Sequence, residues 1–207
     1  MNPEALPVYL LAGGRSSRFG SDKARALLGG SPLILQVARL LSPYAADLKV
    51  VAASSGAYAD LGLETLADTY PAAGPLGGLY TALSDCRTHA EFPWLLLASC
   101  DCWGVRPDQL ETLLRAPRTG CLAVAFKTSH WQPLWALYHT DLLAEVETRL
   151  STGQGALWHL LDAVSAQAIE LGSDPGWIQI NRPVELERAN RRFPGQDTQL
   201  GPEPGPA

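Results

Sequence analysis

The feature that most constrains the fold is an alternation between short apolar runs and longer segments with helical periodicity. The runs Val8–Ala12 and Trp94–Ala98 contain no charged residue, which is typical of strands buried on both faces of a parallel sheet. After Ser31-Pro32, apolar residues recur at helical spacing up to Leu41. This predicts a helix with Ser31 as N-cap and Pro32 at its first position. Strands that alternate with helices predict an α/β protein, a three-layer α/β/α sandwich with a mostly parallel, Rossmann-like sheet.

The same alternation continues along the chain, less regularly beyond Gly120. The further strands are expected near Lys49–Ala53, Leu63–Ala67, Cys121–Phe126, Pro133–Tyr138, Gln167–Leu171 and Trp177–Ile180, some of the later ones antiparallel. The further helices are expected near Leu76–Asp85, Pro107–Leu114, Asp141–Leu150 and Leu157–Asp162, with a last one opened by Pro183. We expect one domain over residues 1–193 and a disordered tail over 194–207, which is rich in Pro, Gly, Gln and Asp.

Composition excludes several classes of protein. An apolar content of 46% in 207 residues suffices for one core. The net charge of −5 argues against a broad nucleic-acid-binding surface. Because the chain has neither an apolar run of about 20 residues nor a signal-peptide pattern, we expect a cytoplasmic protein without membrane contact. The cysteines at 86, 100, 102 and 121 lack the paired spacing of a zinc site. Cys100 and Cys102 could form a redox pair, but the interpretation as buried free thiols is favoured.

The segment Leu11–Lys23, LAGGRSSRFGSDK, is the most informative for function. It follows the first expected strand and combines adjacent Gly13 and Gly14, whose backbone can approach a phosphate, with the cations Arg15, Arg18 and Lys23. It is neither a Walker A loop nor a dinucleotide GxGxxG motif. The alternative is a glycine-rich turn followed by solvated charges. On chemistry alone, Arg15 and Lys23 are candidate catalytic residues that stabilise charge on an α-phosphate and a leaving pyrophosphate.

Two carboxylates follow other expected strands. Asp101 comes after Leu95–Ser99, at the strand end where ligands bind in open α/β sheets, and it can hold Mg²⁺ on phosphate oxygens. The alternative is an Asp that caps the following turn. Asp68 follows Leu66-Ala67 and can accept hydrogen bonds from a base or ribose. Glycines in the GPLGG stretch after Asp68, Gly77 and Gly78 among them, can let a backbone approach a nucleotide or can serve close helix–sheet packing.

These motifs resemble the molybdenum cofactor guanylyltransferase (MobA) family of NTP transferases. LAGGRSSRFGSDKA is similar to the family's LAGGxSxRMGxDKA signature, and Asp68 with GPLGGL is similar to its D…GPLxGL segment. QPLWALY and QINRPVEL are similar to the family's HPxxALY and NxNTPxEL segments, so the resemblance spans about residues 7 to 190. It implies a nucleotide-diphospho-sugar transferase-like fold. It also implies transfer of GMP from GTP to the terminal phosphate of molybdopterin.

The resemblance also implies roles for individual residues. Nucleotide-binding residues would be Leu11, Ala12, Gly13, Gly14, Lys23, Asp68, Gly77, Gly78 and Asp101. Asp101 would be the Mg²⁺ ligand, and Asn181 would bind the acceptor, unless Asn181 serves with Pro183 to start the last helix. Trp131 and Trp135 flank the expected acceptor region. They are interpreted either as core residues or as a surface on which a flat ring such as a pterin could pack. Transient contact with molybdopterin-handling proteins is a further implication.

The sequence departs from the family pattern at several positions. The proline of the family's D-x-P pattern is absent after Asp101, and no Asn ends the second expected strand at Val50–Ser54. Gln179 replaces an Asn, and Gly155-Ala156 replaces a region that tends to carry arginine. Three alternatives therefore stay open: a cytidylyltransferase for the same pterin, a nucleotidyltransferase for a sugar phosphate, and a non-catalytic GTP-binding regulatory protein.

Overall fold

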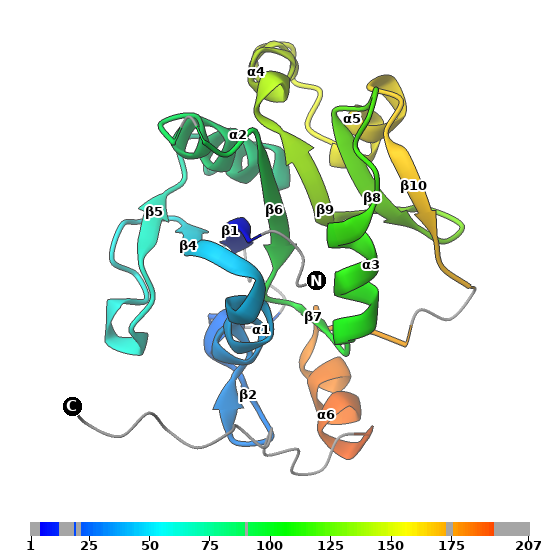
Figure 1. Cartoon of the computed structure of the whole chain (residues 1–207). Helices are drawn as coiled ribbons and strands as arrows, with labels where there is room; N and C mark the ends of the chain where they lie inside the picture. Colours follow the sequence, from blue (N-terminus) through cyan, green and yellow to red (C-terminus); the bar gives the residue numbers. More distant parts are fainter. Residues whose placement is uncertain (1–4, 13–18, 20–21, 90, 173–175, 193–207) are drawn as a thin grey trace, which may run out of the picture.

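The computed structural model describes residues 5–12, 19, 22–89, 91–172 and 176–192. The expected disordered tail, 194–207, lies outside these residues, as do Gly13, Gly14 and Arg15. Within the described part, the chain forms one central sheet with helices on both faces (Figure 1).

The central sheet has seven strands in the order β10-β8-β9-β6-β1-β4-β5. They are β1 (Leu6–Leu11), β4 (Ala45–Ala52), β5 (Thr65–Ala67), β6 (Trp94–Ser99), β8 (Ala123–Lys127), β9 (Trp131–His139) and β10 (Gln167–Glu170). Strand β9 runs antiparallel to both neighbours, and all other pairings in the sheet are parallel. The expectation of a mostly parallel sheet with some antiparallel pairing is confirmed.

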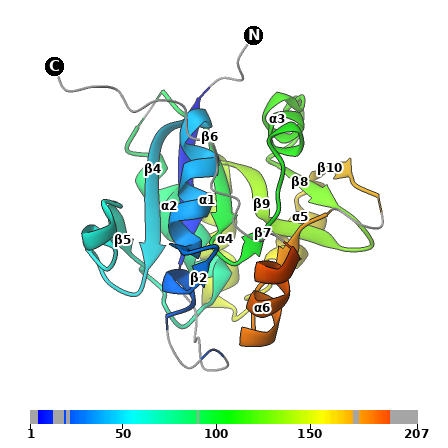
Figure 2. The same cartoon turned by 90° about the horizontal axis from the view of Figure 1, so that it is seen from below.

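Helices cover both faces of this sheet (Figure 2). Helices α1 (Leu33–Leu41) and α3 (Pro107–Arg115) pack into one core layer. Helices α2 (Pro75–Cys86), α4 (Leu143–Ser151) and α5 (Leu157–Ala163) pack into the other. The three-layer α/β/α architecture is therefore confirmed.

The first strand shows why its sequence is apolar throughout. Val8 and Leu10 point into the layer beneath α1, whereas Tyr9 and Leu11 point into the layer beneath α2. Because successive side chains of a strand face opposite sides, a strand covered on both faces must be apolar at every position. All six residues of β1 are buried.

The start of α1 differs from the prediction. Ser31 and Pro32 form β3 (Ser31–Pro32), which pairs antiparallel with β2 (Leu27–Leu28), and Pro32 rather than Ser31 is the N-cap of α1. Gly29 and Gly30, with φ of 57° and 85°, make the two-residue turn between these strands. Two successive positive φ angles give the turn that suits a tight antiparallel hairpin, which is why Ser31 pairs as a strand instead of capping a helix.

A second small sheet brings the C-terminal part of the domain to the end of β6. Strand β7 (Cys102–Trp103) pairs antiparallel with β11 (Ile178–Gln179), and the amide of Ile180 donates to the carbonyl of Asp101 at 2.7 Å. Helix α6 (Pro183–Arg192) follows β11 and packs through Ala189 and Leu186 with Leu28 of the β2–β3 hairpin. Segments about 80 residues apart in the chain thus meet next to Asp101.

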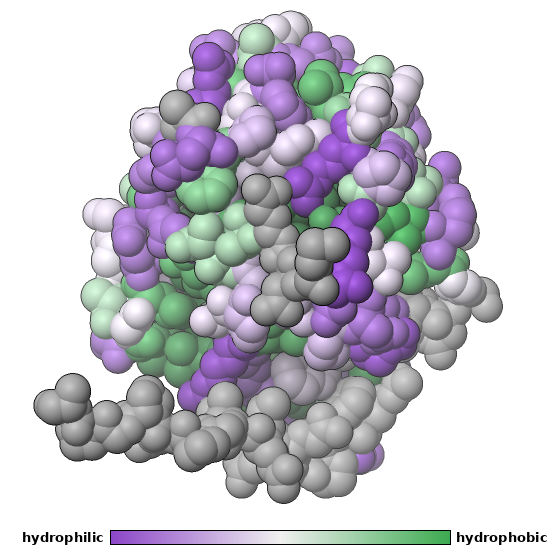
Figure 3. All heavy atoms as spheres, in the orientation of Figure 1, coloured by the Kyte–Doolittle hydropathy of each residue, from purple (hydrophilic) through white to green (hydrophobic). Residues whose placement is uncertain are grey.

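Four short 3-10 helices complete the described elements: η2 (Lys23–Arg25), η3 (Ser42–Tyr44), η4 (Ala59–Leu61) and η5 (Thr140–Leu142). On the face shown in Figure 3, hydrophilic residues are interspersed with apolar ones. Among the described helices, none is long and apolar enough to cross a membrane.

Candidate functional site

A cavity lies at the carboxyl edge of the parallel strands, where the loops after β1, β4, β5 and β6 converge. Its walls comprise Leu11, Lys23, Val51, Asp68, Pro71, Gly74, Pro75, Gly78, Ser99, Cys100, Asp101 and Leu134. The chain leaves β1 toward β4 on one side, and α2 returns it to β6 on the other side of β1. Strand order therefore reverses between β1 and β6, and this is the place where open α/β sheets bind ligands.

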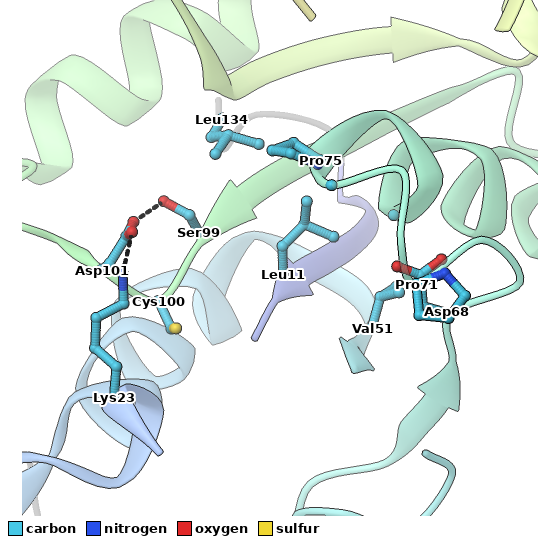
Figure 4. Close-up of a pocket in the computed structure, with 12 residues that line it drawn as sticks. Leu11, Lys23, Val51, Asp68, Pro71, Pro75, Ser99, Cys100, Asp101 and Leu134 are labelled. Carbon is cyan, nitrogen blue, oxygen red and sulfur yellow. Dashed lines mark hydrogen bonds and ion pairs between the residues drawn. The ribbon is translucent and has the colours of Figure 1, made fainter. Parts of the chain in front are cut away.

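Lys23 and Asp101 face each other at one end of this cavity (Figure 4). The Lys23 ammonium donates to Oδ2 of Asp101 at 2.6 Å, and the Ser99 hydroxyl donates to Oδ1 of the same carboxylate at 2.7 Å. The side chains of Lys23 and Asp101 are only 19% and 15% exposed. Water therefore screens this pair less than it screens an exposed ion pair. Asp101, which the sequence predicts as a metal ligand, thus contacts the Lys23 ammonium in this structure.

Ser99 is a contact that the sequence reasoning did not assign. It is the last residue of β6 and is buried, with 4% of its surface exposed. Asp101 lies in the turn that directly follows β6. A polar residue at the end of an otherwise apolar strand, two positions before Asp101, was the signal that could have found it.

Asn181 also reaches Lys23. Its Oδ1 accepts a hydrogen bond from the Lys23 ammonium at 3.1 Å. The backbone amides of Asn181 and Arg182 both donate to Oε2 of Glu185, at 2.5 and 2.8 Å, so a side chain of α6 satisfies the backbone at the helix start. The side chain of Asn181 is thereby left to the site, although its neighbour Pro183 does open the helix.

The position of Lys23 follows from a local turn. Asp22 is the N-cap of η2, and its Oδ1 accepts from the amide of Ala24 at 3.0 Å. An N-terminal cap of this kind satisfies a backbone donor that a short helix leaves free. Ala24 is buried against the core, so the side chain of Lys23 projects toward the end of β6.

Asp68 lies at the opposite end of the cavity from Lys23, with Leu11 and Val51 between them (Figure 4). Its amide donates to the carbonyl of Ala52 at 2.7 Å, and its Oδ1 accepts from the amide of Tyr70 at 2.9 Å. The turn after β5 thus holds the carboxylate at the cavity wall.

Gly77 and Gly78 are required by packing in α2. A Cβ at Gly77 would lie 2.3 Å from the carbonyl oxygen of Tyr70, and a Cβ at Gly78 would lie 2.8 Å from Cδ2 of Leu11. Both distances are shorter than a side chain tolerates, so the close-packing interpretation of these glycines is supported. Gly78 also lines the cavity, so packing and ligand contact are compatible at this position.

Ala12 is the last described residue of the LAGG signature before the interval 13–18. Its amide donates to the carbonyl of Val51 at 3.0 Å, which extends the β1–β4 pairing by one residue. The predicted residues Gly13, Gly14 and Arg15 lie outside the described residues.

The cysteines are free thiols. Cys100 lines the cavity, and burial raises the pKa of its thiol to about 12. Burial also raises the pKa of Cys102, with the charge of Asp101 adding to the effect. Both groups therefore stay protonated near neutral pH, and neither is poised as a thiolate nucleophile.

The two tryptophans near the expected acceptor region differ in their surroundings. Trp135 is 2% exposed and belongs to the core beneath α3, so it offers no surface to a flat ligand. The indole nitrogen of Trp131 donates to Asp162 at 2.7 Å, and the ammonium of Lys127 lies 4.6 Å from the ring centroid. Trp131 is thus fixed at the carboxyl edge of the sheet.

Within the described part of the chain, no group of three or more His, Cys, Asp or Glu side chains lies close enough to hold a metal ion. Asp101 offers one carboxylate. This donor set fits Mg²⁺, which commonly takes one or two protein carboxylates and completes its octahedron with water and substrate phosphates.

The fold and the site together define a class. A mostly parallel sheet with helices on both faces is the fold that this chain shares with nucleotidyltransferases of the nucleotide-diphospho-sugar transferase fold. The chain is similar to a crystal structure of molybdopterin-guanine dinucleotide biosynthesis protein A from Archaeoglobus fulgidus, with a TM-score of 0.72, 24% identity and coverage of 90% of this chain and 98% of that one. It is also similar to a CMP:2-keto-3-deoxy-manno-octonic acid synthetase in complex with CTP, with a TM-score of 0.69, 13% identity and coverage of 91% and 98%.

Within that class, the chain belongs to the MobA-like NTP transferase family, whose domain model matches residues 8–168. A relative from Deinococcus radiodurans, named probable molybdenum cofactor guanylyltransferase, is 40% identical over 90% of this chain and 95% of its own length. The molybdenum cofactor guanylyltransferase of Pseudomonas aeruginosa is 36% identical over 93% and 98%. The resemblance inferred from the sequence motifs is therefore confirmed.

Proposed function

We propose that this chain is a molybdenum cofactor guanylyltransferase. It transfers GMP from GTP to the terminal phosphate of molybdopterin that carries molybdenum, and it releases pyrophosphate. This proposal rests on one observation: Lys23 and Asp101 pair at one end of a cavity on the carboxyl edge of the sheet, and Asn181 accepts a hydrogen bond from the same Lys23 ammonium. The family and the names of relatives at 36–40% identity support the choice of substrates.

The reaction is a displacement at the α-phosphorus of GTP by a phosphate oxygen of the acceptor. Because that oxygen is already anionic, it needs no general base, and catalysis rests on positioning and on stabilising charge. The Lys23 ammonium would neutralise the triphosphate and the leaving pyrophosphate. Its hydrogen bonds to Asp101 and Asn181 support this role, because they hold the ammonium at the end of β6. Arg15 is proposed for the same task from the sequence motif.

The remaining proposed contacts divide by substrate. The nucleotide would lie over Leu11 and Gly78 of the cavity wall, and Asp68 would accept hydrogen bonds from the ribose or base. Ala12, Gly13, Gly14 and Gly77 are proposed as further nucleotide contacts from the sequence motifs. Asn181, between β11 and α6, would contact the phosphate or the pterin ring of the acceptor.

Asp101 would hold Mg²⁺. The contact of its Oδ2 with the cationic Lys23 ammonium at 2.6 Å supports this role, since it shows a positive charge beside the carboxylate. When bound, the ion would neutralise phosphate charge and orient the oxygens for in-line attack. Ser99 keeps Oδ1 fixed through its hydroxyl hydrogen bond.

The test is pyrophosphate release by the purified protein with MgCl₂ and each NTP in turn, with and without molybdopterin that carries molybdenum. Release that requires both GTP and the pterin is the expected result. Release with CTP and the pterin would replace guanylyl by cytidylyl transfer. Release with a sugar phosphate in place of the pterin would change the acceptor. GTP binding without release under any condition would leave a GTP-binding regulatory protein.

The end of β4 bears on the choice of base. Ala52 ends β4 and its carbonyl accepts from the amide of Asp68, while Ala53 and Ser54 follow it without an Asn side chain. The comparison of the four NTPs therefore decides the base.

We further propose a single domain over residues 1–193, a cytoplasmic location and transient contact with molybdopterin-handling proteins, without binding of nucleic acid or membranes.

A further inference from the structure

Tyr58 is a buried tyrosine whose hydroxyl lies between two ends of the signature segment. Its ring is 3% exposed and packs in the same core layer as Ala24 and Cys100. The hydroxyl donates to Oδ2 of Asp22 at 3.0 Å, and the carbonyl oxygen of Ala12 lies 3.3 Å from it as a second acceptor. The carboxylate is the stronger acceptor, because a hydrogen bond to a charged group exceeds one to a neutral carbonyl.

Ala12 and Asp22 flank the interval 13–21, which carries GGRSSRFGS in the sequence. Ala12 is anchored to β4 through its amide and the carbonyl of Val51. Asp22 is anchored as the N-cap of the turn that contains Lys23. The Tyr58 hydroxyl thus contacts both Ala12, which precedes Gly13-Gly14, and Asp22, which precedes Lys23.

Arg25 adds a second tie between the same turn and the segment around Tyr58. Its guanidinium lies 5.2 Å from the ring centroid of Tyr58. It donates to both carboxylate oxygens of Asp60 at 2.8 Å and to the carbonyl of Ala57 at 2.7 Å. The turn from Asp22 to Arg25 is therefore held on both sides of Lys23.

We propose that Tyr58 and Asp22 are positioning residues that set the direction of the Lys23 ammonium. This inference rests on the proposed function of Lys23. Neither residue needs to touch the nucleotide. Their effect passes through Lys23, because the η2 turn fixed by Asp22 determines where its side chain projects, and a displacement of about 1 Å at a reacting group is costly.

Tyr58→Phe is the central test, because it removes one hydroxyl and keeps the ring that contacts Arg25. We expect KM for GTP, and Kd for Mg–GTP by calorimetry, to rise about tenfold, with kcat for bound substrate changed less. Tyr9→Phe is the matched control. It also deletes a buried hydroxyl that donates to an aspartate, Asp85 at 2.7 Å, but on the α2 side of the sheet.

Two variants of Asp22 separate positioning from a general loss of stability. Asp22→Ala removes the acceptor for both Tyr58 and the amide of Ala24, whereas Asp22→Asn keeps an oxygen for them. We expect Asp22→Ala to raise the Kd for Mg–GTP and Asp22→Asn to recover most of that loss. The double variant with Tyr58→Phe should be less impaired than the two single effects combined, since both act on one contact.

The outcomes separate the two proposals. If the wild-type protein fails to bind any NTP, the proposed function itself is wrong. If the wild-type protein binds GTP and Tyr58→Phe binds it equally well, or if Tyr9→Phe weakens binding as much, the positioning role is overturned. Thermal unfolding of each variant shows whether the fold is retained. Should Tyr58→Phe not fold, the difference in Kd between Asp22→Ala and Asp22→Asn supplies the answer, and equal binding by these two variants would overturn the positioning role.

Discussion

The ammonium of Lys23 lies 2.6 Å from Oδ2 of Asp101, although 78 residues separate them in the chain. Lys23 comes from the turn that follows β1, and Asp101 follows β6, the neighbour of β1 in the sheet. Their meeting joins two motifs that the sequence presents separately. In the proposed reaction, binding of Mg–GTP would replace this ion pair: Lys23 would contact the phosphates, and Asp101 would hold the metal ion.

Asp101→Asn should lower the rate of pyrophosphate release about 100-fold or more, because it removes the charge that would hold Mg²⁺ and leaves the side-chain shape unchanged. The measurement is steady-state release with GTP and molybdopterin, together with thermal unfolding to show that the fold persists. Asp108→Asn is the matched control, since Asp108 of α3 is exposed and pairs with Arg106, the N-cap of that helix. An Asp101→Asn protein with wild-type activity would remove Asp101 from the mechanism.

Lys23→Met should raise KM for GTP about tenfold and lower kcat, because the phosphates lose a cation in a site with limited exposure to water. Lys23→Arg should restore little of this loss, since a planar guanidinium does not reproduce the position of an ammonium. Arg191→Met serves as control, because Arg191 makes an exposed ion pair with Glu187 on α6. Equal kinetics of Lys23→Met and wild type would contradict the assigned role.

Asn181→Ala should raise KM for molybdopterin about fivefold, while KM for GTP changes less than twofold. The expectation follows from its proposed contact with the acceptor, and the two constants are measured by varying one substrate at saturation of the other. If KM for GTP rises and that for molybdopterin does not, Asn181 acts through its hydrogen bond to Lys23 instead.

Gly78→Ala should destabilise the fold by roughly 1–3 kcal/mol, because the new Cβ would meet Leu11 at 2.8 Å and force the β1–α2 contact apart. Gly77→Ala should cost more, since its neighbour at 2.3 Å is the backbone oxygen of Tyr70, which cannot rotate away. Urea unfolding measures both. Gly172→Ala is the control, with no atom within 4 Å of its Cβ, and an equal loss there would contradict the packing argument.

Stability should fall as the pH rises above about 9. Burial raises the pKa of Cys86 to about 11 and that of Cys100 to about 12, from 9.0. At a pH above 9.0 and below the raised pKa, the thiol is deprotonated in the unfolded chain but still protonated in the folded chain. The unfolded state is therefore favoured more strongly as the pH rises. Cys100→Ala should make the loss between pH 9 and 10.5 smaller by on the order of 1–2 kcal/mol, measured by urea unfolding. At pH 7.5 the thiol is protonated in both states, so Cys100 should contribute no pH dependence to the free energy of unfolding there. If the free energy of unfolding of Cys100→Ala falls with pH as steeply as that of wild type above pH 9, the prediction is wrong.

Much of the fold follows from local sequence patterns. The uninterrupted apolar run of β1 required burial on both faces, and the helical spacing after Pro107 gave α3 at the expected residues. Two departures from the expected secondary structure depend on pairing with another strand. Ser31 became part of a hairpin with Leu28 instead of a helix cap, and Cys102 pairs with Gln179 across the domain.

The sequence by itself determined the family, the layered α/β architecture and the identity of Lys23, Asp68 and Asp101 as candidate site residues, because each rests on a motif or period that is local in the chain. Only the tertiary structure decided that Lys23 bonds to Asp101 and Asn181, and that Tyr58 contacts Asp22. These contacts join segments 36 to 158 residues apart. Strand order and the packing of buried side chains bring such segments together, and neither leaves a periodic signal in the sequence.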